Sequence, residues 1–106
     1  MGEDLAIQKI LDDLESDVDL IQCFGEDKPI SSRFLNTMGT LFEERGIGLV
    51  RAFVKANCGD LQNTACFEKL WGYIERINAL EVPNYIKGFM VKKLEALAEV
   101  KLGRRQ

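Results

Sequence analysis

Residues 3–23 read EDLAIQKILDDLESDVDLIQC and contain the most regular apolar pattern of the 106-residue chain. The apolar positions are spaced by four, three, four and three residues, and they are Ile7, Leu11, Leu14, Val18 and Ile21. This spacing matches the period of an α-helix and predicts a single amphipathic helix that ends at Phe24 and Gly25. Because such a helix must bury its apolar line, the stretch commits the chain to helix packing.

The N-terminal part of the chain, which includes this stretch, is strongly acidic. The first 27 residues hold nine carboxylates and one lysine, whereas the remaining 79 residues hold eight carboxylates and thirteen cations. Asp17 and Asp19 lie near the predicted C-terminal end of the helix, where a carboxylate is unfavourable, so we expect basic neighbours there. The whole chain has a net charge of only −3, which gives no strong attraction to nucleic acid or anionic lipid.

Four further helical patterns follow the first, at about 31–45, 47–57, 64–80 and 84–102. Ser31 or Ser32 is expected to cap the second helix, and Gly46 stands where that helix would end. Gly46 and Gly48 leave two alternatives open, a turn between two helices or a kink in one. The wide apolar arc of residues 47–57 makes that helix the best candidate for the buried centre.

Short connections between these patterns favour antiparallel neighbours. The sequence therefore predicts an all-α fold, a compact bundle of four to five short antiparallel helices in a single domain, with residues 103–106 as a frayed tail. Gly72 and Gly88 fall inside helical patterns, where glycine costs about 1 kcal/mol relative to alanine. We expect close helix packing at both positions.

The cysteine content argues against a disulfide framework or a metal centre. Cys23, Cys58 and Cys66 are odd in number and sparse, so we expect reduced thiols. The chain has no histidine and no C-x-x-C pair, which excludes the common zinc-binding sets. Cys58 and Cys66 could approach each other if their loop folds back, but each is accounted for as a small apolar residue. We expect no bound metal and no cofactor.

Composition and motifs also limit the functions that the chain can have. No apolar run is long enough to cross a membrane and the N-terminus lacks a signal-peptide pattern, so we expect a cytoplasmic protein without membrane contact. Nucleotide-binding and hydrolase motifs are absent from the sequence, as is any histidine base. We therefore expect a protein that is not an enzyme.

The favoured hypothesis is a protein-interaction module, an adaptor, regulator or assembly subunit that binds another protein or itself. Strict four-three spacing is typical of paired helices, and an aromatic residue at the edge of an apolar face often anchors an interface. The alternative is a first helix that only covers the core of its own domain. The candidate interface consists of Ile7, Leu11, Asp12, Leu14, Asp17, Val18, Asp19, Ile21, Trp71, Lys93 and Lys101.

A nucleic-acid-associated regulator is the runner-up, because the last twenty residues are rich in cations that could contact phosphates. On a helical wheel the lysines scatter, Lys93 falls on the apolar face, and no aromatic residues interleave with them for base stacking. The candidate contacts are Lys87, Lys92, Lys93, Lys101, Arg104 and Arg105.

Overall fold

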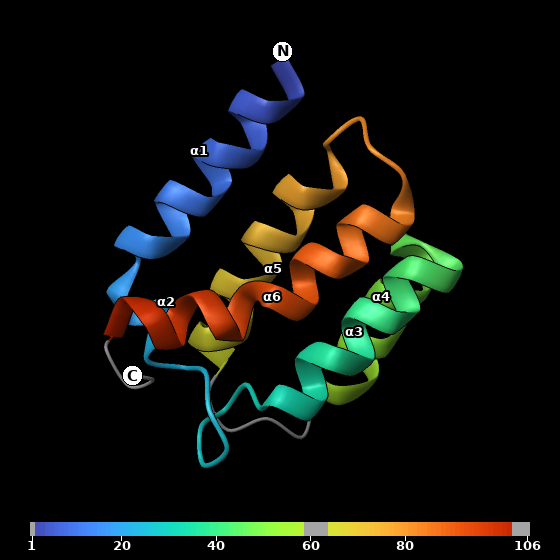
Figure 1. Ribbon diagram of the computed structural model, residues 1–106. Coiled ribbons are helices and arrows are strands. Elements are labelled where there is room, and N and C mark those ends of the chain that lie inside the picture. Colours follow the sequence, from blue (N-terminus) through green and yellow to red (C-terminus); the bar gives the residue numbers. More distant parts are fainter. Residues whose placement is uncertain (1, 59–63, 103–106) are drawn as a thin grey trace.

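The computed structural model describes residues 2–58 and 64–102, with side-chain surroundings for residues 4–57, 64–94 and 96 (Figure 1). Six helices form in this part of the chain: α1 (Gly2–Ser16), α2 (Val18–Ile21), α3 (Ser32–Arg45), α4 (Ile47–Cys58), α5 (Thr64–Asn78) and α6 (Asn84–Leu102). The predicted compact all-α fold is confirmed. The Cα radius of gyration is 13.1 Å, close to the value of about 13 Å expected for a compact domain of this length. The predicted tail, residues 103–106, lies outside the described residues.

The first amphipathic stretch forms two helices and not the single one predicted. The Asp17 carboxylate accepts a hydrogen bond from the Leu20 backbone N–H at 3.1 Å and so caps α2. A short acidic side chain satisfies the backbone better at such a break than inside a helix. As a result Val18, expected on the apolar line, is 49% exposed, whereas Leu20 and Ile21 are fully buried.

A disulfide joins Cys23, after α2, to Cys66, in the first turn of α5, with their Cα atoms 5.9 Å apart. The expectation of reduced thiols is wrong for this pair, because the fold brings together cysteines that are 43 residues apart in the sequence. The loop after Cys23 is fixed by the Ile30 N–H, which donates to the Cys23 carbonyl at 2.9 Å. The side chain of Cys58 lies outside the described part, so the approach of Cys58 to Cys66 that the sequence left open is not tested.

Helices α3 and α6 run side by side in the view of Figure 1, and two glycines let them approach closely. A Cβ added at Gly39 would lie 2.8 Å from the Gly88 carbonyl oxygen. One added at Gly88 would collide with the Gly39 carbonyl and lie 2.9 Å from the Glu43 backbone nitrogen. Close packing at Gly88 is therefore confirmed. The same prediction for Gly72 is wrong, because its added Cβ meets no atom within 4 Å.

Gly46 separates α3 from α4, which settles the alternatives left open by the sequence. Its φ of 84° suits glycine, and its N–H donates to the carbonyls of Leu41 and Phe42 at 3.2 and 3.1 Å. The prediction of α4 as the central helix is wrong. Among its described side chains only Val50 is fully buried, since α4 packs on α3 and α5 at the edge of the bundle.

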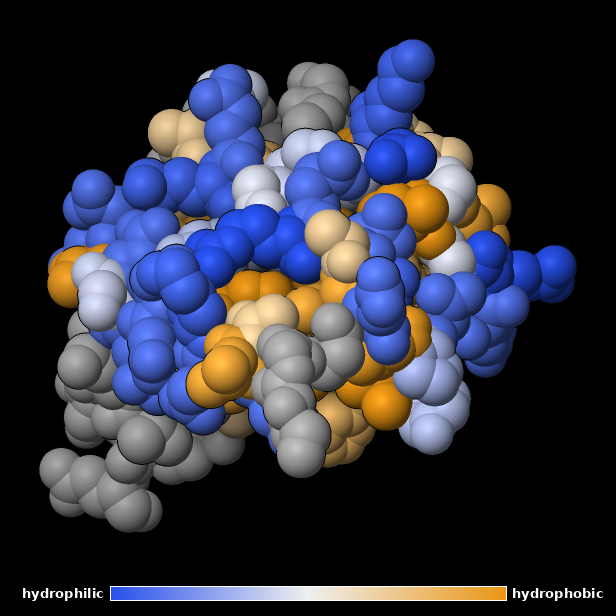
Figure 2. Space-filling view, turned by 90° about the horizontal axis from the view of Figure 1, so that it is seen from above, coloured by the Kyte–Doolittle hydropathy of each residue, from blue (hydrophilic) through white to orange (hydrophobic). Residues whose placement is uncertain are grey.

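The core instead gathers side chains from the other helices and from the loop after α2. Its largest fully buried members are Phe24, Phe42, Leu14, Leu20, Ile21, Ile30, Leu35, Met38, Leu70, Ile74, Ile77 and Leu94. Seen from above, the surface is mainly hydrophilic, with hydrophobic side chains showing in a hollow between them (Figure 2). None of the helices in the described residues has the length and apolar character needed to cross a membrane.

Replacing Gly88 with alanine should destabilise the protein. Alanine favours an isolated helix by about 1 kcal/mol, but here its methyl group would collide with α3, and overpacking costs about 1–3 kcal/mol. We expect a net loss in the free energy of unfolding, measured by urea denaturation. Gly72→Ala is the matched control and should gain up to about 1 kcal/mol, because it adds a methyl group in open space. Equal gains in the free energy of unfolding from both substitutions would contradict the close approach of α6 to α3.

The Cys23–Cys66 disulfide should stabilise the fold by about 2–4 kcal/mol, because it closes a long loop in the unfolded chain. Urea denaturation with and without reductant measures this difference. Cys23→Ser should remove the sensitivity to reductant, whereas Cys58→Ser keeps both bridged cysteines and should retain it. Mass spectrometry of unreduced digests should find the Cys23 and Cys66 peptides linked. Alkylation of both cysteines in unfolded, unreduced protein would contradict the pairing.

Candidate functional site

The predicted interface line on the first helices points mostly into the chain's own core. Leu14 and Ile21 are fully buried, and Ile7 and Leu11 are half-buried. Val18, Asp12 and Asp19 are exposed, while Asp17 is half-buried. The arrangement corresponds to the alternative reading of the sequence, in which the first helix covers its own domain.

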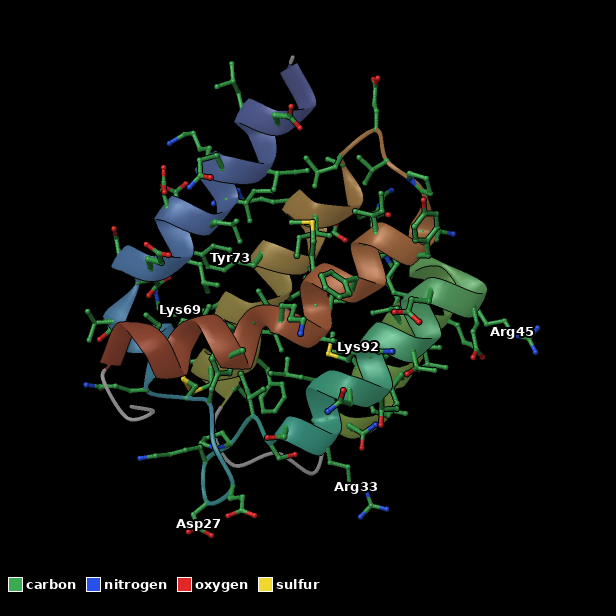
Figure 3. All side chains as sticks on the ribbon, in the orientation of Figure 1. Asp27, Arg33, Arg45, Lys69, Tyr73 and Lys92 are labelled. Carbon is green, nitrogen blue, oxygen red and sulfur yellow. A yellow bond between two sulfur atoms is a disulfide. The ribbon has the colours of Figure 1, made fainter. Side chains whose placement is uncertain are left out.

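The acids of this segment meet cations that α5 supplies. Arg76 Nη2 lies 2.8 Å from Asp13 Oδ2, and Lys69 Nζ lies 3.4 Å from Asp17 Oδ1. Lys69 and Tyr73 project from α5 toward the first helices (Figure 3). The expectation of a basic neighbour near Asp17 is confirmed. Lys93, part of the candidate interface in the sequence analysis, lies on α6.

These contacts shift two pKa values. The hydrogen bond from Arg76 is the main cause that lowers the pKa of Asp13 below its ordinary 3.8, and Lys9 adds to it. Burial, followed by the charge of Asp17, raises the pKa of Tyr73 to about 12. The Tyr73 hydroxyl donates to Asp17 Oδ2 at 3.3 Å, an interaction that ionisation would destroy. Within the described residues no three Asp, Glu, Cys or His side chains are grouped so that they could hold a metal ion.

The lysines of α6 are partly committed to intramolecular contacts. Lys87 is only 9% exposed, and its Nζ donates to the Asn78 carbonyl at 2.7 Å, at the C-terminal end of α5. Lys92 Nζ lies 3.2 Å from Glu43 Oε1 on α3. Each contact engages an ammonium group that the nucleic-acid hypothesis assigned to phosphate binding.

The predicted position of Lys93 on the apolar face is wrong. Lys93 is exposed, and its Nζ lies 5.1 Å from the centre of the Phe89 ring, which is itself 56% exposed. Phe89 stays exposed because the close approach at Gly88 buries the neighbouring face of α6, with Val91 and Leu94. The side chain of Lys101 and the residues Arg104 and Arg105 lie outside the described part.

The strongest candidate site is a surface hollow of about 450 Å³ between α4 and α5, which we call the α4–α5 hollow. Trp71 lies in it half-buried, as expected for an aromatic residue at the edge of an apolar face. The hollow is mainly apolar, and its lining consists of Arg51, Val54, Lys55, Thr64, Phe67, Glu68 and Trp71.

Helical spacing explains how these residues meet. Phe67 and Trp71 are four residues apart on α5, and Arg51 and Lys55 are four apart on α4, so each pair shares one side of its helix. Phe34 braces the region from α3, with its ring centre 5.0 Å from that of Phe53 and 5.2 Å from that of Phe67. Rings packed at these distances fix the position of Phe67 in the wall of the hollow.

The two sides of the hollow carry opposite charges. Arg51 and Lys55 stand on the α4 side, and Glu68 stands on the α5 side. Arg51 Nη2 lies 3.4 Å from Glu75 Oε1, with both side chains about half exposed, so this ion pair contributes little to stability. Lys55 and Glu68 form no ion pair within the described part of the chain.

Sequence reasoning identified Trp71 but missed the other residues of the α4–α5 hollow. The spacing of Phe67, one helical turn before Trp71, was a visible sign that the two share a surface. Val54 was missed because α4 was expected at the centre of the bundle. Comparison with known proteins adds no candidate, because no family model, no curated protein and no solved structure matches the chain.

Replacing Asp17 with asparagine should lower the pKa of Tyr73 from about 12. The substitution removes the charge that disfavours the phenolate, but burial of the ring remains, so we expect the pKa to stay above 10. Absorbance titration in a Tyr85→Phe background isolates the Tyr73 phenol. Asp12→Asn, at an exposed carboxylate that hydrogen-bonds Gln8, is the control and should leave the pKa unchanged. No change with Asp17→Asn would contradict the assigned contact.

Proposed function

We propose that the chain is a protein-interaction module that binds its partner through the α4–α5 hollow. The observation that carries the proposal is Trp71, which lines an apolar hollow with cations on one side and an acid on the other. Tryptophan contributes a large contact area and a polar N–H group, and it is enriched among residues that dominate binding energy.

The shape of the hollow favours a protein partner over a small molecule. Small-molecule sites usually bury most of the ligand surface, whereas this hollow lies at the surface between two helices. A partner that lays apolar side chains on Val54, Phe67 and Trp71 would remove that apolar surface from water. Burial of apolar area is the main favourable term in protein association.

Self-association through the first helix remains a prediction, but its apolar line offers little surface. Leu14 and Ile21 are inside the core, and the exposed large apolar residues of α1 and α2 are Leu5 and Val18. The nucleic-acid role also remains a prediction, and the engagement of Lys87 and Lys92 weakens its basis.

We further propose that the protein works in an oxidising compartment, in place of the cytoplasm that the sequence led us to expect. Cytosolic thiols are kept reduced, whereas disulfides persist in secreted and periplasmic proteins. The Cys23–Cys66 disulfide supports this location.

Site-specific photocrosslinking tests the proposed binding surface. A photoreactive amino acid in place of Glu68 should crosslink a defined set of proteins in extracts of the native source, and mass spectrometry identifies them. The same amino acid in place of Arg33, an exposed residue of α3 outside the hollow, is the control. Proteins captured at both positions alike would contradict a binding surface at the α4–α5 hollow.

A further inference from the structure

We infer that the partner segment is an amphipathic helix that carries carboxylates along one flank of its apolar stripe and cations along the other. It would lie lengthwise in the α4–α5 hollow. This inference rests on the proposed function and adds to it the chemistry of the partner.

The walls of the hollow favour a helix as the occupant. Both walls are helices, and a third helix laid between them presents apolar side chains at intervals of three and four residues. Val54 on α4 and Phe67 and Trp71 on α5 are the surfaces that such a stripe would cover. The volume of about 450 Å³ is at the lower end of the range for binding sites and accommodates a few large side chains.

The charges beside the hollow specify the flanks of the partner. Arg51 and Lys55 are separated by about 6 Å along α4, and Glu68 and Glu75 by about 10 Å along α5. A helix between them faces cations on one side and acids on the other. Like charges brought against either row would be repelled, so a partner with mixed flanks is selected over one with uniform flanks.

The charged side chains beside the hollow can form new ion pairs with a partner at little cost in free energy. Lys55 and Glu68 make no ion pair in the described part of the chain, and the Arg51–Glu75 pair is 3.4 Å long and about half exposed. Such surface pairs are worth about 0–1 kcal/mol, so a partner can exchange them for contacts of its own. A second copy of this chain fits less well, because the apolar line of its acidic helix is buried in its own core.

Three synthetic helical peptides test the inference. All carry the same leucine stripe and no aromatic residue; one has glutamates on one flank and lysines on the other, one has glutamates on both, and one has lysines on both. Trp71 is the only tryptophan of the chain, so its emission reports occupancy of the hollow directly. In low salt we expect the mixed peptide to bind about tenfold more tightly than either uniform peptide, with the difference reduced at about 0.5 M salt.

Charge reversals in the protein should redirect this preference. Lys55→Glu weakens the cationic row and should favour the lysine-only peptide, whereas Glu68→Lys weakens the acidic row and should favour the glutamate-only peptide. Both positions are exposed, so the variants should fold, and circular dichroism checks this. Phe89→Ala, on α6 outside the hollow, should leave all three affinities unchanged.

The outcomes separate the inference from the proposed function. Equal binding of all three peptides at Trp71 would overturn the mixed-flank partner and leave a protein-binding hollow. No change of Trp71 emission with any peptide, together with no specific photocrosslink at position 68, would overturn both. A dimer in sedimentation at about 100 μM protein, with Trp71 protected from quenchers before any peptide is added, would overturn the inference in favour of a second copy.

Discussion

The approach of α3 to α6 at Gly39 and Gly88 is the constraint on which the rest of the structure depends. Backbone meets backbone there, and the side chains of Lys92 and Glu43 also close on the two glycines, so the approach requires that both positions lack a Cβ. This close approach sets the rotation of α6 about its axis. That rotation buries Val91 and Leu94 and leaves Phe89 exposed.

The position of α4 follows from the same close approach of α3 to α6. Helix α3 is held on α6, and Gly46 reverses the chain immediately after it, so α4 must run back along the outer side of α3. From there α4 reaches α5 along only one of its sides. Its remaining apolar width is left at the surface, where Leu49 is exposed and the half-buried Val54 lines the α4–α5 hollow.

The fold class could be predicted from the sequence because helical spacing is a local property that a single stretch displays. Ser31 or Ser32 was predicted as a cap, and it is Ser31 that accepts the expected hydrogen bond, from the Phe34 N–H at 3.1 Å. The break at Asp17 was missed, since the regular apolar spacing continues across it and predicts one unbroken helix. The local signal was in the residue type, because aspartate is a better cap than helix interior.

The disulfide and the hollow depend on contacts between distant segments, and no local pattern contains them. Three cysteines permit several pairings, and only the fold selects Cys23 with Cys66. Lys93 was predicted on the apolar face by its position on a helical wheel, but a wheel shows which residues share a face and not which face is covered. Trp71 was identified because its position at the edge of an apolar face is visible within one helix.

The distribution of charge after folding favours the α4–α5 hollow over the acidic first helix as the proposed binding surface. The first helices are strongly acidic, yet Asp13 and Asp17 already have Arg76 and Lys69 beside them. Their electrostatic complement lies within the chain, so an outside cation would have to displace it. At the α4–α5 hollow the cations of α4 and the acids of α5 lie beside apolar surface that the other described residues leave uncovered. Specific association needs both uncovered apolar area and charges able to select a partner, and among the described residues this hollow provides the two together.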